Sequence, residues 1–219
     1  MEDGYEYTGR QLAKRYCLLV IALFFMACGI AMSKLAELGT TPISCIPAVL
    51  SYSWLTIGAW TIIVNAILIV LEALILRKDF RIFQVLQLAV AFILGIFVDI
   101  WVELLSFVDP QTYAAQWFWC ILSAVILAFG VFMEVRADTL VAPGEGFVMA
   151  VVSKYHIPFP KMKVINDVTM VTLGAILAVS TLGTLRGVRE GTIFAAIALG
   201  FVIGFYRKYL GGAFDRLLK

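Results

Sequence analysis

Two short, proline-led stretches hold the residues best suited to bind a charged ligand. They read Gly39-Thr40-Thr41-Pro42-Ile43-Ser44 and Ala142-Pro143-Gly144-Glu145-Gly146. Proline fits the first turn of a helix, where unpaired backbone N–H groups and the helix dipole favour an anion. We therefore predict two helix starts that converge on a carboxylate, sulfonate or phosphate. The hydroxyl groups of Thr40, Thr41 and Ser44 would add further donors.

Glu145 lies in the first turn of the second stretch, where its carboxylate has several uses. An acidic side chain at this position can simply cap the helix, because the dipole there is positive. It can instead bind a proton or the amine of a substrate. The sequence leaves these alternatives open.

Polar residues inside long apolar runs are costly in lipid and usually face a cavity or a partner. The deepest are Asn65, Asp99, Asn166 and Asp167. We predict that Asp99, Glu145 and Asp167 couple a proton or ion to the site. The alternative for Asp167 is a structural ion pair, because Lys163 precedes it by four residues and would pair with it on one helix face. Glu72 and Glu134 lie near the ends of their runs and are expected at headgroup level.

Arg189 and Thr192 open the last apolar run of the chain. The Arg189 guanidinium could hold an anionic ligand through two parallel hydrogen bonds. Its alternative is an interfacial arginine whose stem lies along apolar surface. The predicted solute site therefore comprises Gly39, Thr40, Thr41, Ser44, Asn65, Gly144, Glu145, Gly146, Asn166, Arg189 and Thr192.

Composition assigns these residues to a membrane protein. Of the 219 residues, 62% are hydrophobic and 15% are charged, and the mean hydropathy is +0.96. Soluble domains have about a quarter of their residues charged. A chain this apolar cannot cover a water-facing globule, so a soluble enzyme is excluded.

The apolar residues form six runs long enough to cross a bilayer, which takes roughly 20 residues. These runs are 16–34, 56–76, 83–105, 116–135, 163–182 and 191–208. Two shorter runs, 41–54 and 143–155, predict re-entrant or interfacial helices. The predicted fold class is thus an all-α membrane bundle of about six transmembrane helices and two short re-entrant helices, in a single domain over 1–219.

The distribution of Lys and Arg predicts the orientation. Basic residues gather at the N-terminus, in the 77–81 loop, around the second short run and at the C-terminus, whereas 103–116 has none. Both termini are therefore expected in the cytoplasm. Arg186 and Arg189 would then lie on the outer side of the membrane, contrary to the preference of Lys and Arg for the cytoplasmic side.

The two halves are weakly repeated. A shift of 101 positions brings Pro42 onto Pro143 and Asn65 onto Asn166. Each copy, about 16–108 and 116–210, holds an odd number of crossings, so the second copy is predicted to be inverted. Inverted repeats with discontinuous helices are typical of secondary transporters, which bind solute near the midplane. The alternative is a duplication that served only to build a stable bundle.

Several classes of site lack support. The four cysteines form no CxxC pair, and His156 has no ligand partner at metal-binding spacing. No Walker loop, HExxH or GxSxG motif occurs. We therefore expect no catalytic activity, no metal and no cofactor. The net charge of +2 without a basic tract predicts no nucleic-acid partner. The GxxxG match at Gly200–Gly204 favours packing within the bundle and leaves a homodimer open.

Three segments together resemble the YczE/YyaS/YitT family of bacterial membrane proteins. They are Ala36-Glu37-Leu38-Gly39-Thr40-Thr41-Pro42-Ile43-Ser44, then Ala142-Pro143-Gly144-Glu145-Gly146-Phe147, and Val188-Arg189-Glu190-Gly191-Thr192-Ile193. The second often reads PGDG in that family, so Glu145 keeps the charge and changes the reach. The resemblance implies the same architecture in a bacterial inner membrane and supplies no substrate.

We interpret the chain as a secondary transporter of a small anionic or zwitterionic solute, with the lipid bilayer and that solute as its partners. One alternative is the substrate-binding subunit of a multi-component importer, which predicts a co-purifying ATPase. Another is a non-transporting membrane regulator, which predicts no ligand-sized cavity between the repeats. A membrane enzyme comes last, because no catalytic constellation is present.

Overall fold

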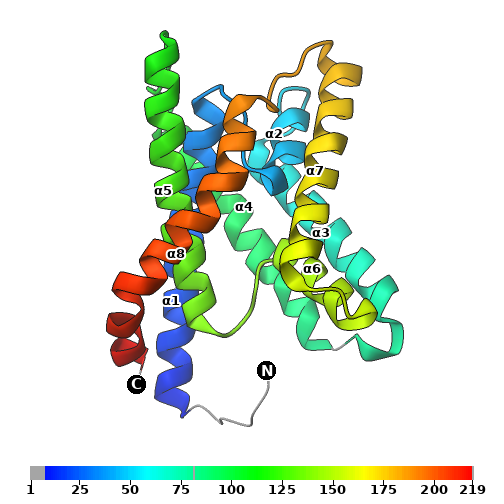
Figure 1. The fold of residues 1–219 in the computed structure, drawn as a ribbon, viewed down its shortest axis with the longest axis vertical. Coiled ribbons are helices and arrows are strands. Elements are labelled where there is room, and N and C mark those ends of the chain that lie inside the picture. The colour runs from blue at the N-terminus through cyan, green and yellow to red at the C-terminus, as the bar shows by residue number, and fades with distance from the viewer. Residues whose placement is uncertain (1–7, 81, 219) are drawn as a thin grey trace.

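The computed structural model describes residues 8–80 and 82–218, and every regular element within those ranges is helical (Figure 1). The α-helices are α1 (Gly9–Leu35), α2 (Cys45–Leu50), α3 (Ile57–Leu76), α4 (Gln87–Leu104), α5 (Tyr113–Ala137), α6 (Pro143–Tyr155), α7 (Phe159–Leu182) and α8 (Glu190–Leu218). Short 3-10 helices are η1 (Pro42–Ser44), η2 (Arg77–Asp79) and η3 (Ile82–Leu86).

Six of the helical segments are long and apolar enough to cross a membrane. They are Gly9–Leu35, Ile57–Asp79, Gln84–Leu104, Tyr113–Ala137, Lys161–Leu182 and Glu190–Leu218. This confirms the predicted all-helical membrane-type fold with six long helices. Two helices exceed the predicted runs, since α1 begins at Gly9 and α8 reaches Leu218. Lys and Arg are good helix formers, so the charged residues that flank an apolar run extend the helix.

The bundle has two ends, called upper and lower as in Figure 1. The N-terminal end of α1 and the C-terminal end of α8 lie together at the lower end, where Lys14 Nζ donates to the Leu217 carbonyl at 3.0 Å. Threonine hydroxyls accept hydrogen bonds at the starts of α3 and α5. Thr56 Oγ1 accepts from Ala59 N at 3.1 Å at the start of α3, and Thr112 Oγ1 accepts from Ala115 N at 3.2 Å at the start of α5. Each cap satisfies one of the free N–H groups of a first turn.

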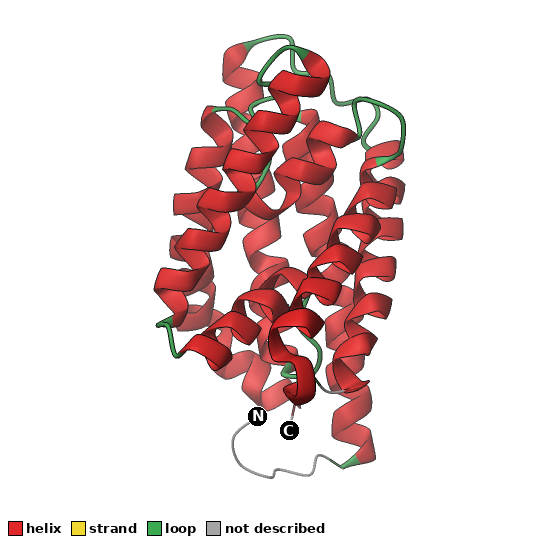
Figure 2. Cartoon of the chain, turned by 90° about the vertical axis from the view of Figure 1, so that its right-hand side faces the viewer, coloured by secondary structure: helices red, strands yellow, loops and turns green. Residues whose placement is uncertain are grey.

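The core of the bundle lies around α1, which packs against α4 and α5. Helix α8 covers α5, while α3 packs on α4 and α6, and α7 packs on α2 and α6. Within the described ranges, no comparable packing joins α7 to α8. Figure 2 shows these helices running between two ends that carry the loops.

The two short helices differ in length from each other. Helix α6 has the predicted bounds of 143–155, whereas the first short run forms η1 and the brief α2, followed by turns at residues 51–54. Ser51 and Ser53 lie in those turns, and serine side chains compete with the helical backbone for hydrogen bonds. The prediction of one helix over 41–54 was therefore wrong in its bounds. A helix as short as α2 also offers only a weak dipole.

Candidate functional site

The starts of the two short segments meet inside the bundle. A methyl group on Gly144 would overlap the side chain of Ile43, so η1 and the first turn of α6 lie in van der Waals contact. Gly144 is buried and Ile43 is half-buried. The contact itself is apolar, so any polar site must lie to either side of it.

Above this contact, the α1–α2 loop is hydrogen-bonded to the loop that precedes α8. Thr40 N donates to the Gly187 carbonyl at 3.2 Å, and Gly191 N donates to the Leu38 carbonyl at 2.8 Å. Gly39 has a φ of +91°, and a Cβ there would lie 2.6 Å from the Arg189 nitrogen. Only glycine suits this backbone conformation and this close approach.

Buried hydroxyl groups accompany these loops. The Oγ1 atoms of Thr40 and Thr41 are buried and have no hydrogen-bond partner, and Thr192 is 1% exposed. A cost of about 1–3 kcal/mol attends each buried polar group left unpaired. Thus Gly39, Thr40, Arg189 and Thr192, which the sequence predicted together, are brought together, and the adjacent Thr40 and Thr41 each carry an unpartnered hydroxyl.

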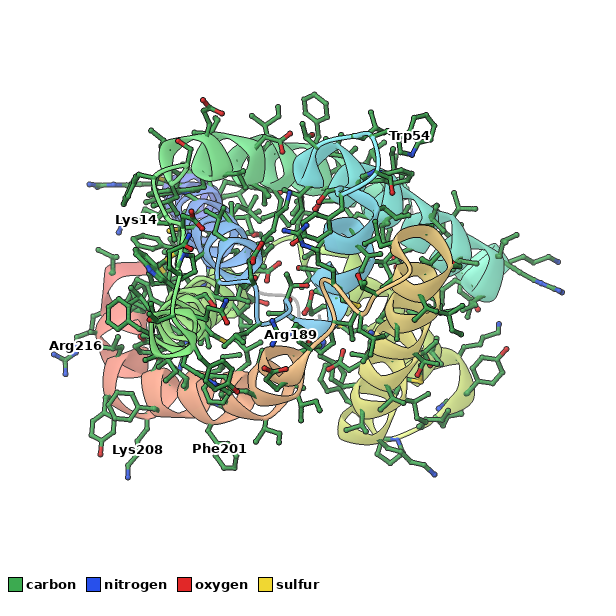
Figure 3. All side chains as sticks on the ribbon, turned by 90° about the horizontal axis from the view of Figure 1, so that it is seen from above. Lys14, Trp54, Arg189, Phe201, Lys208 and Arg216 are labelled. Carbon is green, nitrogen blue, oxygen red and sulfur yellow. The ribbon has the colours of Figure 1, made fainter. Side chains whose placement is uncertain are left out.

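Arg189 projects over the centre of the bundle when the molecule is seen from above (Figure 3). Its Nη1 donates to the Glu37 carbonyl at 2.9 Å, and its Nη2 lies 3.0 Å from Glu190 Oε1. Both donor groups are therefore directed at protein acceptors in this conformation. Anion binding by Arg189 stays a prediction that requires these contacts to open.

A pocket of about 470 Å³ opens beside Arg189 at the upper end, and it is lined by Glu37, Thr184, Leu185, Arg186, Val188, Arg189 and Glu190. Arg186 Nη2 lies 2.6 Å from Glu37 Oε1, and its guanidinium carbon is 4.4 Å from the centre of the Tyr52 ring. Burial raises the pKa of Tyr52, and the hydrogen bond with Glu37 raises the pKa of Arg186. The pocket balances two arginines against two glutamates, so it has no net preference for anions.

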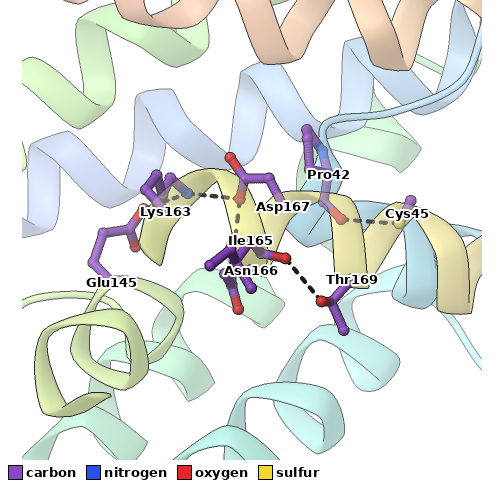
Figure 4. Close-up of polar contacts among 8 residues, drawn as sticks. All are labelled: Pro42, Cys45, Glu145, Lys163, Ile165, Asn166, Asp167 and Thr169. Carbon is purple, nitrogen blue, oxygen red and sulfur yellow. Dashed lines mark hydrogen bonds and ion pairs between the residues drawn. The ribbon is translucent and has the colours of Figure 1, made fainter. Parts of the chain in front are cut away.

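Below the Ile43–Gly144 contact, an ionic cluster joins α6 to α7 (Figure 4). Lys163 Nζ lies 3.0 Å from Asp167 Oδ1 and 3.9 Å from Glu145 Oε1, and Asn166 Nδ2 donates to Asp167 Oδ1 at 3.5 Å. The Asp167 and Glu145 side chains are 19% and 27% exposed. The Lys163–Asp167 pair expected as the ordinary alternative is thus present, and Glu145 shares the same lysine.

Sequence reasoning did not predict the burial of two carboxyl groups in this region. Glu134 is 2% exposed, and its Oε1 accepts from Ala142 N at 2.6 Å, just before α6. Glu72 is 1% exposed and accepts a hydrogen bond from Gln84 Nε2. Both side chains are thus buried among protein atoms, and their depth in the bilayer stays a prediction. The sequence signal for this burial was a single acidic residue within an apolar run, because such a residue is rarely exposed to lipid.

The remaining predicted residues fall into separate places. Ser44, Asn65 and Asn166 are buried. Asp99 of α4 lies against the start of α3, where its Oδ1 accepts from Gly58 N at 2.8 Å, and it is close enough to Lys34 to interact with its charge. Asp99 therefore has a structural partner, and its coupling role stays a prediction. The described residues contain no group of three or more side chains that could hold a metal ion.

The fold and these buried polar groups define a helical membrane-type protein. The chain belongs to DUF6198, a family of unknown function, whose model matches residues 13–208. It is also 32% identical to the "Uncharacterized protein YyaS" of Bacillus subtilis over 88 residues. That match covers 40% of this chain and 42% of the relative, so it spans less than half of either protein. No solved structure matches the chain. The wider grouping with YczE and YitT stays a prediction.

Proposed function

We propose that this protein is a secondary transporter that binds a small zwitterionic solute between two inverted repeats. The observation that carries the proposal is the meeting of Ile43 and Gly144 inside the bundle, with buried polar groups on both sides of the contact. A solute held there would lie near the midplane, as in other inverted-repeat transporters.

Pairs of equivalent positions support the repeat. Ile43 and Gly144, which touch, are 101 positions apart, as are Glu37 and Asp138, whose φ angles of 57° and 48° both lie in the left-handed region. Equivalent helices also make equivalent contacts, since α1 packs on α4 as α5 packs on α8, and α2 packs on α7 as α6 packs on α3. A two-fold relation between the halves accounts for all of these pairs.

The course of the short helices supports their re-entrant nature. The segment from η1 to α2 runs from the Ile43 contact back to the upper end, where Tyr52 meets Arg186. Helix α6 runs from the same contact to the lower end, where Lys154 Nζ lies 3.2 Å from Asp79 Oδ2. Each segment would thus enter and leave on one side of the membrane.

The charge balance favours a zwitterion over a purely anionic solute. Below the contact, Glu145 and Asp167 share one lysine, Lys163, and Glu134 lies near Glu145. This excess of carboxylates suits the ammonium group of a solute. Above the contact, the unpartnered hydroxyls of Thr40 and Thr41 suit its acidic group. We further infer a location in the bacterial cytoplasmic membrane, with the lower end and both termini in the cytoplasm.

A thermal-shift screen of the purified protein against amino acids, organic acids, sulfonates and thiols tests the proposal. Amino acids are expected to raise the midpoint of unfolding most, and the best of them should then be taken up by proteoliposomes. Glu145→Gln and Asp167→Asn should abolish both effects. Asp79→Asn is the matched control, since it removes a charge from an exposed ion pair outside the cluster. Binding and uptake that survive in both cluster variants would reject the proposed site.

A further inference from the structure

Glu72 is the one ionisable residue of α3, and it is buried where α3 meets α4 and α6. Its Oε1 accepts a hydrogen bond from Gln84 Nε2, while its Oε2 is buried without a partner. A carboxylate with one oxygen unpaired in a membrane-type core is a costly arrangement.

Gln87 provides a second buried acceptor beside this carboxyl group. It is 4% exposed, its side chain lies next to Glu72, and its Oε1 also has no partner. The first turn of α6 closes over it, because a Cβ on Gly146 would lie 2.6 Å from Gln87 Oε1. Two adjacent acceptors therefore lack a donor, and a single hydrogen between them would satisfy both.

The groups that face Glu72 supply no positive charge. Its polar side-chain neighbours, Gln84 from η3 and Gln87 from α4, are neutral. The ionisable side chains on the elements packed against α3 are otherwise engaged or exposed, and those of η2, which are Arg77, Lys78 and Asp79, are all exposed. On α6, Glu145 contacts Lys163 and Lys154 contacts Asp79. On α4, Asp99 accepts from Gly58 N and Glu103 is exposed near the end of the helix. On α2, Cys45 donates to the Met170 carbonyl.

From this arrangement we propose that Glu72 is a proton-binding site, in which Oε2–H donates to the Gln87 amide oxygen. The proton comes from water, converts the carboxylate to a carboxylic acid, and returns to water when the site opens. Since the first turn of α6 covers Gln87, movement of α6 would open both the acid and its Gln87 acceptor to water. Resting on the proposed transport function, this names Glu72 as the group that couples protons to the motion of α6.

Infrared spectroscopy of the purified protein in lipid tests the site without any solute. At neutral pH, the parent protein should show the carbonyl band of a protonated carboxyl group. Glu72→Gln should remove this band, and Gln87→Leu should shift it to higher frequency by removing the acceptor. All of these proteins, including the parent, carry Glu134→Gln, because Glu134 is equally buried and would add a carboxyl band of its own. Glu103→Gln is the matched control, because Glu103 is exposed near the end of α4, and it should leave the band in place.

A parent protein that lacks the band, a band that persists in Glu72→Gln, or a band unmoved in Gln87→Leu would each overturn the proposal. The Gln87→Leu measurement keeps the test decisive if Glu72→Gln does not fold. Because no solute is involved, a protein that shows the expected band but moves no solute would reject the transport function and leave the proton site standing.

Discussion

The helix pairs α3–α4 and α7–α8 occupy matching places in the chain but are held in different ways. In α3–α4, a Cβ on Gly58 would overlap the Gly95 carbonyl oxygen, so the two backbones are in direct contact. Asp99 strengthens this pair by accepting from Gly58 N at 2.8 Å and from Thr56 Oγ1 at 2.6 Å. Small residues and a charged hydrogen-bond acceptor thus lock α3 to α4.

In α7–α8, the glycines in the middle of α8 have nothing packed on them. A Cβ on Gly200 or Gly204 would have no atom within 4 Å, and Phe201 between them is 77% exposed. The start of α8 is instead held through loops, by Thr40 N to the Gly187 carbonyl and by the Arg186–Glu37 ion pair. The comparison teaches that α3 and α4 are joined by direct contacts, whereas no comparable contacts join α7 to α8 within the described ranges.

The largest expected effect comes from substituting the glycines of the two pairs. Gly58→Ala should lower the free energy of unfolding by about 1–3 kcal/mol or more, because its methyl group has no room against the α4 backbone. Gly200→Ala should leave stability unchanged or raise it by up to about 1 kcal/mol through helix propensity. Thermal and denaturant unfolding in detergent micelles measures both. Equal losses in the two variants would break the distinction between the pairs.

A somewhat smaller effect is expected at the acceptor that joins α4 to α3. Asp99→Ala should cost about 1.5–3 kcal/mol, the usual contribution of hydrogen bonds to a charged group. Asp109→Ala removes the same charge from an exposed loop at the same end of the bundle and should change stability little. If unfolding midpoints show no difference between these variants, Asp99 does not lock the pair.

The smallest effect concerns the loops that hold α8. Burial raises the pKa of Tyr52 above its ordinary value of about 10, so the folded protein keeps this proton to higher pH than the unfolded chain. The resulting stability is complete below about pH 10 and is lost as pH rises through the raised pKa. Tyr52→Phe should therefore lose less stability than the wild type on alkaline titration. Tyr209→Phe, at an exposed ring, should behave like the wild type.

Much of the fold follows from the apolar pattern, and the polar site follows only in part. The six long helices and α6 were predicted, because apolar run length and proline position act locally. The pairing of Lys163 with Asp167 was foreseen as an alternative for the same reason. The burial of Glu72 and Glu134 was not foreseen, since it depends on where α6 packs after leaving the α5–α6 loop. The length of α2 was overestimated because serine turns interrupt an otherwise apolar run.

The sequence by itself determined that this chain is a helical membrane-type protein. Its apolar runs are long enough to cross a bilayer, and a helix satisfies every backbone hydrogen bond of such a run within the run itself. It also determined where the two short segments begin. Only the tertiary structure decided that Ile43 meets Gly144, that Gln87 faces Glu72, and that Gly95 is packed while Gly200 is open. Those contacts join residues far apart along the chain, so their energies depend on how whole helices pack and not on local propensity.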